Sequence, residues 1–335
     1  MENYPSELRR GHLDHRWVLI ASGRADRPQD YINHTPSKVR RDPFSPENIR
    51  KEDIIDLIPN NDGTEYETPS TWKAMAVRNL YPFVGKVAGR KPRSTGDIRD
   101  GVGAHEIIIH SPDPDRDFGS FESEQAQAVL ELYLKRYNHL SHMPEVKHVQ
   151  IFTNRGKEAG ASVVHPHTQV VALPVVPPYI KDLVRIAGKH YDKSQSKLSE
   201  DEVEREIHEA SRVIYENSKF LVYCPFAPLA DYHIRIMPKE RGSYFHEITQ
   251  EQVEHLSRVL NLVFRRLDRI AGIPPYNAYI RTAPVGADEK RLRGFRWHID
   301  ILPHLAIPGG LEISTGLTVV TVFPEDAAHA LRQDS

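Results

Sequence analysis

The chain has 335 residues, enough for two ordinary domains, and its 44 Lys and Arg nearly balance its 46 Asp and Glu. The formal net charge of -2 gives no electrostatic case for nucleic acid as the main partner. We expect a cytoplasmic protein, because there is no apolar run of membrane-spanning length, no apolar N-terminal signal, and only one cysteine, Cys224.

A long irregular segment precedes the first predicted helix. Residues 32–70 carry many Pro, Asn and Asp residues, which predicts an irregular loop. A short NLYPF motif occupies residues 79–83. Apolar side chains recur at 4-3-4-3 spacing within residues 126–140, which is the period of an amphipathic helix. Strands are predicted on either side of this helix, at residues 105–112, 148–152 and 165–174.

A second series of elements repeats this order. A YCPF motif at residues 223–226 corresponds to the NLYPF motif of the first series. Helical spacing returns within residues 253–270, and Thr249 with Gln252 predicts a capping box at the start of this helix. Strands are predicted at residues 232–239, 276–280 and 297–303.

The two series form an internal repeat of strand, helix, strand and strand. Such a repeat predicts an α+β fold with two halves, each a mainly antiparallel sheet with packed helices. Residues 177–219, between the halves, form a polar and charged stretch in which residues 200–215 predict an exposed helix.

The chemistry-bearing segment is residues 154–169, NRGKEAGASVVHPHTQ. Alternate residues of a strand share a face, so His165, His167 and Gln169 are expected to point the same way. The preceding loop holds Gly160 and Ser162, whose backbone and hydroxyl groups suit a phosphate. An imidazole can attack phosphorus and leave again, so the segment predicts phosphoryl chemistry.

Other interpretations of the histidine pair stay open at this point. The chain has 18 histidines, so two of them two positions apart can arise by chance. The pair can also bind a metal or form hydrogen bonds in a wet cleft. A short motif is only a hypothesis until its structural context agrees.

The sequence around these histidines resembles a known family. GASVVHPHTQVVALP is similar to the active-site segment of the galactose-1-phosphate uridylyltransferase family, in the histidine-triad superfamily. The resemblance covers nearly the whole chain and includes the relatives that are ADP-glucose phosphorylases. It implies two histidine-triad-like halves: residues 1–180 with the nucleophile, and residues 181–335 as a degenerate half.

The resemblance also implies a role for individual residues. His167 matches the nucleophile that becomes nucleotidylated, and Gln169 matches the side chain that bonds the transferred phosphoryl group. The remaining matches are phosphate donors, nucleotide contacts and one sugar contact: Ser162 and Gly160 for the phosphates, Asn79, Asn154, Arg24 and Arg27 for the nucleotide, and Glu312 for the sugar hydroxyls.

The chain departs from the family at its metal sites. Asp42, Ser45 and Pro114 stand where many members have zinc ligands, and only His165 remains. We therefore expect no metal cofactor, and we expect His165 to orient the nucleophile strand by hydrogen bonding. Arg281 and Asp300 likewise replace the histidines of a second family metal site, which leaves His298 with Asp300 as a degenerate counterpart of the His167 segment.

The resemblance implies ping-pong transfer of UMP from UDP-glucose to a hexose 1-phosphate through a nucleotidyl-His167 intermediate. An ADP-sugar phosphorylase or adenylyltransferase is a second hypothesis, and a nucleotide-binding relative without catalysis is a third. The expected partners are a nucleotide-sugar, a sugar 1-phosphate and a second copy of the chain in a homodimer, with neither nucleic acid nor membrane.

Overall fold

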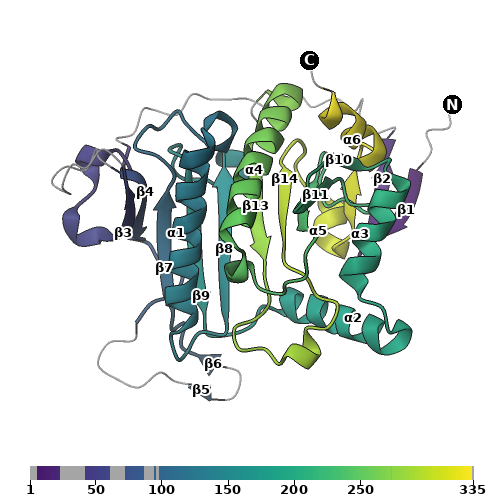
Figure 1. Ribbon diagram of the computed structural model, residues 1–335, viewed down its shortest axis with the longest axis horizontal. Helices are drawn as coiled ribbons and strands as arrows, with labels where there is room; N and C mark the ends of the chain where they lie inside the picture. Colours follow the sequence, from purple (N-terminus) through teal and green to yellow (C-terminus); the bar gives the residue numbers. More distant parts are fainter. Residues whose placement is uncertain are drawn as a thin grey trace.

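The computed structural model describes residues 6–22, 42–60, 72–86, 94–95, 98–272 and 274–333 (Figure 1). Its centre is a ten-stranded antiparallel sheet in the order β10-β11-β12-β14-β13-β8-β9-β7-β4-β3. The two long helices, α1 (Ser123–Ser141) and α4 (Gln250–Ala271), lie side by side across one face of this sheet, as Figure 1 shows. The main core lies between these helices and the sheet.

The first half of the sheet contains five strands. β7, α1, β8 and β9 form the expected strand-helix-strand-strand series, and β3 and β4 precede it as two strands that the series did not include. Their order across the sheet is β3-β4-β7-β9-β8. The strands are β3 (Ile54–Pro59), β4 (Trp72–Arg78), β7 (Ala104–Ile109), β8 (His148–Arg155) and β9 (His167–Leu173).

The second half repeats this arrangement around α4. Its order across the sheet, β10-β11-β12-β14-β13, is that of the first half, position for position. The strands are β10 (Val213–Glu216), β11 (Phe220–Tyr223), β12 (Ile234–Pro238), β13 (Tyr276–Arg281) and β14 (His298–Pro303). The internal repeat inferred from the sequence is thus present in the topology, and the α+β prediction is confirmed.

Within the sheet, the two halves meet at one antiparallel strand pair. β8 pairs with β13, with Tyr276 opposite Arg155 and Tyr279 opposite Phe152. Because each half contributes its fourth strand, the junction has the geometry of a twofold relation between the halves. The sheet is continuous across this junction, so the division at residue 180 stays a prediction.

The helices form where their sequence period buries one face. In α4 the apolar stripe packs against the sheet and α1, with Val253, Leu256 and Leu267 almost fully buried. The expected capping box is present, since Thr249 accepts from the Gln252 N–H and Gln252 accepts from the Thr249 N–H. The helix ends at Gly272, whose φ of +62° is a left-handed conformation that glycine adopts without strain.

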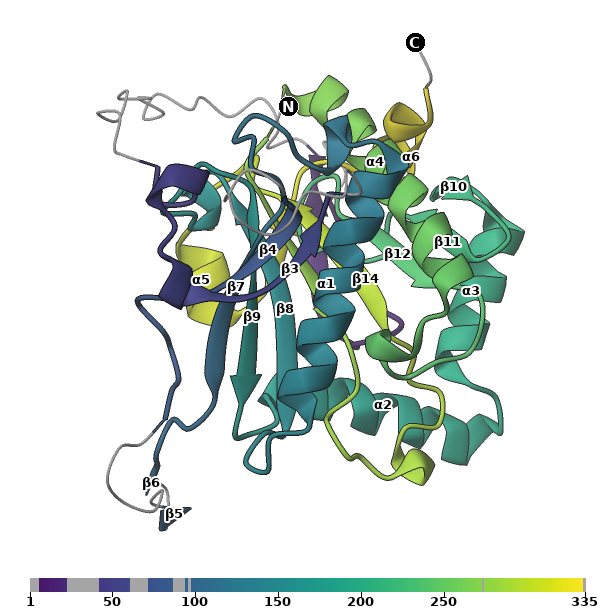
Figure 2. The same cartoon turned by 60° about the vertical axis from the view of Figure 1, so that its left-hand side comes forward.

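Smaller elements surround the second half. A three-stranded sheet joins β1 (Ser6–Arg10), β2 (Trp17–Ala21) and β15 (Thr318–Val320), with β15 parallel to β2. The chain's first described strands therefore pair with a strand near its end, which the sequence did not suggest. The helices outside the main pair are α2 (Pro178–Ser194), α3 (Leu198–Glu209), α5 (Gly310–Thr315) and α6 (Pro324–Arg332). By contrast, the two-residue strands β5 (Ser94–Thr95) and β6 (Ile98–Arg99) pair with each other and lie beyond the end of β7 in the first half, as Figure 2 shows.

Two local predictions were wrong. Residues 32–70 are not all loop, because β3 forms within them and pairs with β4. Residues 200–215 are not one exposed helix: α3 ends at Glu209, and Glu202 and Glu206 on it are buried. Both errors arise because contacts with neighbouring elements decide these segments: strand pairing with β4 for β3, and burial of one side for α3. No local periodicity identifies those neighbours.

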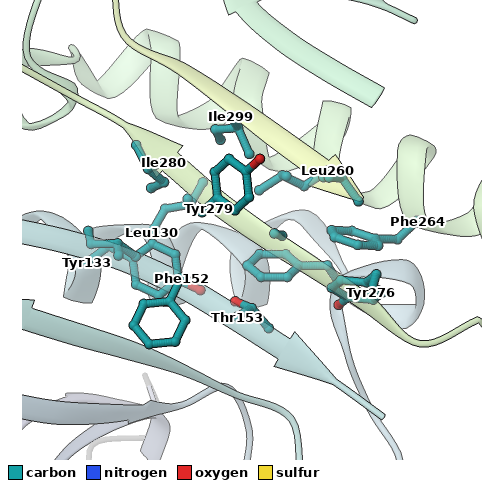
Figure 3. Close-up of a pocket in the computed structure, with 14 residues that line it drawn as sticks. Leu130, Tyr133, Phe152, Thr153, Leu260, Phe264, Tyr276, Tyr279, Ile280 and Ile299 are labelled. Carbon is teal, nitrogen blue, oxygen red and sulfur yellow. The ribbon is translucent and has the colours of Figure 1, made fainter. Parts of the chain in front are cut away.

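A small cavity of about 40 Å³ lies where the halves meet. Figure 3 shows side chains from α1, α4, β8, β13 and β14 converging on it, among them Leu130, Phe264 and Ile280. This space fits little more than one water molecule, so it is too small for a nucleotide-sugar. No helix among the described residues is both long and apolar enough to cross a bilayer.

Candidate functional site

His167 is the first residue of β9 and is almost fully buried, with 5% of its surface exposed. Its Nδ1 lies 2.7 Å from the carbonyl oxygen of His165. A carbonyl only accepts, so Nδ1 carries the proton and the lone pair is on Nε2. Burial lowers the pKa of His167 to about 4, which keeps the imidazole neutral at physiological pH. The ring is therefore in the form that a nucleophile requires.

His165 joins the nucleophile strand to two distant parts of the chain. Its Nδ1 lies 2.7 Å from Oδ2 of Asp42, and its Nε2 lies 2.7 Å from the carbonyl oxygen of Ser111. Asp42 also accepts bonds from the Phe44 N–H and the Ser45 hydroxyl. Although burial alone would raise it, the pKa of Asp42 is lowered by these bonds, chiefly the one from His165. His165 is thus held by hydrogen bonds on both ring nitrogens.

This set of donors does not fit a zinc ion. The Ser111 carbonyl requires a proton on Nε2 of His165, and the Asp42 carboxylate occupies the Nδ1 side. Ser45 offers a hydroxyl already bonded to Asp42, and the Pro114 side chain offers no donor atom. Tetrahedral zinc needs four nitrogen, sulfur or oxygen ligands around an open centre.

We expect the purified protein to contain less than one zinc per chain and to keep its activity in a chelator. The reason is that a hydrogen bond between Asp42 and His165 joins the segments that a metal would otherwise join. Elemental analysis and assays with and without chelator measure both quantities. One tightly bound zinc per chain would contradict the prediction.

Gln169 lies on the same face of β9 as His167, two residues further along. Its Oε1 is 2.9 Å from Nε2 of His105, a residue on the neighbouring strand β7. The Asn79 amide nitrogen lies 3.0 Å from that same ring nitrogen. The structure thus brings Asn79, His105 and Gln169 into one chain of contacts beside the nucleophile.

Two residues of this site were not identified from the sequence. His105 is 4% exposed, and its alternation within β7 places it on the Gln169 face. Phe44 packs its ring edge against His167 with the ring centroids 4.9 Å apart. The alternation of faces along the predicted strand could have placed His105 with the site. Nothing in the sequence relates Phe44 to His167, which is more than a hundred residues away.

The glycine-containing loop runs from the end of β8 to His165. Gly156 has φ of +81°, and a Cβ there would lie 2.8 Å from Pro275, so only glycine fits without a shift. Gly160 has φ of +84° and lies beside Asn154, while Ser162 is exposed. Asn154 accepts a bond from Asn277 of β13. The loop keeps its phosphate-binding role as a prediction.

A buried polar network lies on the opposite face of β9, beneath the nucleophile. The Thr168 hydroxyl contacts Nε2 of His110 at 2.8 Å and the hydroxyls of Tyr133 and Thr153 at 2.5 Å each. Nδ1 of His110 lies 3.2 Å from Asp117. Polar networks in which every group has a hydrogen-bond partner rigidify a core. This network therefore holds β9 in place on the face opposite His167.

The second half carries a different set of side chains at the corresponding place. His298 bonds the Arg296 carbonyl through Nδ1, as His167 bonds that of His165, and burial lowers the pKa of His298 to about 3. Asp300 corresponds to Gln169 and is bound by Arg235 through two hydrogen bonds, of 2.7 and 3.2 Å. Burial would raise the pKa of Asp300, but this guanidinium holds it well below its usual range.

Arg281 completes this second cluster. Its guanidinium lies between the rings of Tyr179 and Tyr279, at 4.4 and 4.1 Å from their centroids. Its Nε is 3.9 Å from Asp300. A position surrounded by guanidinium groups repels a metal cation, which agrees with the expectation that the second family metal site is absent.

One further group of described residues has metal-ligand spacing. His12, Glu202 and Glu206 place potential ligand atoms within 4.8 Å of one another. Glu206 is already bonded by Arg212, and Glu202 is bonded by Arg205. Both carboxylates are therefore already engaged by guanidinium groups, and burial raises the pKa of Glu206 to about 7.

Three further predicted residues have no described contact at this site. Arg24 and Arg27 lie outside the described residues. The Glu312 carboxylate accepts the Gly309 N–H and caps α5, so its contact with a sugar stays a prediction.

Comparison with known proteins gives consistent results for both halves. Residues 1–177 match the family described as galactose-1-phosphate uridyl transferase, N-terminal domain, and residues 206–288 match the HIT domain. The chain is 32% identical to an ADP-glucose phosphorylase of Arabidopsis thaliana over 346 residues, covering 100% of this chain and 95% of that protein. It is 26% identical to a galactose-1-phosphate uridylyltransferase of Thermotoga maritima, covering 98% of each chain. A crystal structure of an ADP-glucose phosphorylase from Arabidopsis thaliana with bound ADP-glucose superposes with a TM-score of 0.84 at 29% identity, over 99% of this chain and 100% of that one.

Proposed function

Because the chain belongs to the galactose-1-phosphate uridylyltransferase family, we propose that it carries a nucleoside monophosphate on His167 between two phosphorylated partners. Its relatives are named as uridylyltransferases and ADP-glucose phosphorylases, which are enzymes of the nucleotidyltransferase kind. The observation that supports the proposal is the single bond from Nδ1 of His167 to the His165 carbonyl. It leaves Nε2 as the nucleophilic atom.

The proposed reaction has two steps. In the first, Nε2 of His167 attacks the α-phosphorus of a nucleotide-sugar, and the bond from that phosphorus to the bridging oxygen breaks. The sugar 1-phosphate leaves with this oxygen, and the nucleotidyl group stays on the ring. In the second, a phosphate oxygen of the acceptor attacks the same phosphorus, the P–N bond breaks, and neutral His167 is restored.

The protein side chains have distinct parts in these steps. The ring becomes an imidazolium when the P–N bond forms, and the His165 carbonyl stabilises its remaining N–H. Gln169 supplies a hydrogen bond to the transferred phosphoryl group, and Ser162 and Gly160 supply donors for the adjacent phosphate. Positioning and charge stabilisation provide most of the rate in phosphoryl transfer.

We further propose ADP-glucose as the donor and inorganic phosphate as the acceptor, which would yield ADP and glucose 1-phosphate. This choice follows the likeness to the Arabidopsis ADP-glucose phosphorylase, at 32% identity over the whole chain. UMP transfer from UDP-glucose to a hexose 1-phosphate is the second candidate, supported by the relative from Thermotoga maritima.

Intact mass spectrometry tests the proposal in one experiment. The protein is mixed with ADP-glucose or with UDP-glucose, without acceptor, and quenched. An AMP adduct supports the phosphorylase, and a UMP adduct supports the uridylyltransferase. If neither donor modifies the chain, the proposed covalent transfer is wrong and the protein is a nucleotide-binding relative without this catalysis.

The partners and location of the protein stay predictions. We expect a cytoplasmic homodimer, and the exposed α5 side chains Leu311 and Ile313 are compatible with a contact surface. Light scattering at micromolar concentration measures the association, and a monomer at this concentration would contradict it.

A further inference from the structure

His105 is a buried histidine beside Gln169 to which the family resemblance gave no role. Its ring is held at both nitrogens by groups of known character. The backbone N–H of Phe83 lies 3.1 Å from Nδ1, and Oε1 of Gln169 lies 2.9 Å from Nε2. These two contacts determine where the ring proton sits.

The proton must be on Nε2. A backbone N–H can only donate, so Nδ1 of His105 must present its lone pair to Phe83. A neutral imidazole with an unprotonated Nδ1 carries its hydrogen on Nε2. That hydrogen needs an acceptor, which identifies the atom of Gln169 facing His105 as the amide oxygen. Burial lowers the pKa of His105, which favours this neutral form.

The Asn79 amide does not disturb this assignment. Its nitrogen lies 3.0 Å from Nε2 and 3.3 Å from Nδ1 of His105. An atom in the ring plane at these distances would overlap the ring carbons, so the amide lies over a face of the ring. The Phe83 ring also stacks on His105, with the centroids 4.7 Å apart and the planes 21° apart. The ring plane is therefore left for the two hydrogen bonds.

We propose that His105 is a positioning residue that fixes the Gln169 side chain with its amide nitrogen turned away from β7. The Gln169 NH₂ group is then presented on the His167 face of β9 as a donor for the phosphoryl oxygens. A freely rotating glutamine would present its oxygen part of the time and repel those same oxygens. This inference rests on the proposed function, since it requires a phosphoryl group at His167.

The second half supports this interpretation by comparison. His233 occupies the place of His105, and its Nδ1 is also 3.1 Å from a backbone N–H, that of Leu229. Its Nε2 lies 3.1 Å from Oδ1 of Asp300, the residue at the Gln169 place. The histidine is thus kept in both halves, but an ionised carboxylate has no hydrogen to give a phosphoryl group. Only the first half combines the fixed histidine with a donor.

A double-variant cycle tests whether His105 acts through Gln169. The quantity measured is the first-order rate of nucleotidyl transfer to His167 at saturating nucleotide-sugar. We expect Gln169→Ala to slow this step by about 10²- to 10³-fold, as when one donor to a developing charge is removed. His105→Leu should slow it by roughly 10- to 100-fold, through misplacement of that donor, with little change in KM.

The decisive measurement is the double variant. If His105 acts through Gln169, His105→Leu adds no more than about twofold in the Gln169→Ala background, which is the error expected for additivity. Multiplication of the two effects would overturn the proposal. His105→Gln, which can still donate an amide hydrogen to Gln169, should recover part of the rate lost in His105→Leu.

A control variant and a spectroscopic measurement separate this proposal from the proposed function. His233→Leu removes the matching histidine of the second half and should lower stability without slowing transfer. Nitrogen-15 NMR of the unliganded protein should show the His105 ring protonated at Nε2 between about pH 6 and 8. The lower limit is chosen because a histidine ordinarily takes up a second proton below about pH 6. A ring protonated at Nδ1 would refute the positioning role whatever the activity. Absence of any nucleotide adduct in the wild-type protein would instead refute the proposed function.

Discussion

Replacing His167 with glycine is expected to abolish nucleotidyl transfer while leaving the protein folded. The variant lacks the imidazole at the start of β9, whose Nδ1 bonds a carbonyl and whose Nε2 carries the lone pair, so the covalent intermediate cannot form. Loss of a nucleophile of this kind lowers kcat by of the order of 10⁴-fold or more. The measurements are the intact-mass adduct and steady-state turnover, with circular dichroism as the test of folding.

His298→Ala is the matched control for this variant. It removes the histidine at the corresponding position of β14, whose Nδ1 also bonds a carbonyl two residues earlier. We expect it to lower stability and to leave transfer nearly unchanged. Near wild-type exchange in His167→Gly, together with no exchange in His298→Ala, would show that the second half is the active one.

Replacing Asp300 with alanine is expected to give the largest loss of stability. Asp300 is 1% exposed and makes two hydrogen bonds to Arg235, which is 7% exposed. Without the carboxylate, Arg235 stays buried and loses both hydrogen bonds to Asp300, with Arg281 nearby. Breaking a buried ion pair from one side costs about 3–5 kcal/mol of the free energy of unfolding. Urea unfolding followed by fluorescence measures this change.

A double variant shows whether the loss of stability comes from the buried charge of Arg235 that remains without its carboxylate partner. Replacing both partners, as Asp300→Leu with Arg235→Met, should recover most of the stability, because hydrophobic substitutes for a buried pair are often neutral. The transfer rate per folded molecule should be nearly unchanged in Asp300→Ala. A loss below about 1 kcal/mol, the scale of an exposed ion pair, would contradict the prediction.

The sequence was informative about the topology because its signals are local. The periods around α1 and α4 and the apolar runs of β7, β8, β12 and β13 identify each element without its neighbours. The pairing of β2 with β15 depends instead on contacts between residues 300 positions apart, such as Val18 and Thr318. β3 was missed for a related reason, since its pairing with β4 overrides a loop-like composition.

The candidate site could be predicted only where its residues are neighbours in sequence. His165, His167 and Gln169 fall within five positions, so strand alternation alone places them together. Asp42 and His105 reach the same place from other segments. Strand alternation could place His105 on one face of β7, but the sequence does not show that β7 pairs with β9. The tautomer of His167 depends on a backbone carbonyl, which the amino-acid sequence does not specify.

The antiparallel junction of β8 and β13 means that the inner edge of each half is able to pair with a copy of itself. An antiparallel strand edge placed against a twofold copy gives a closed, isologous interface. Two separate copies of the first half joined through β8 would build a sheet of the same ten strands, with a nucleophile on each side of the axis. Linking two such units in one polypeptide removes the need for them to be identical. In this chain the two units differ, because the second carries Arg235, Arg281 and Asp300 at the place that corresponds to the His167 site of the first.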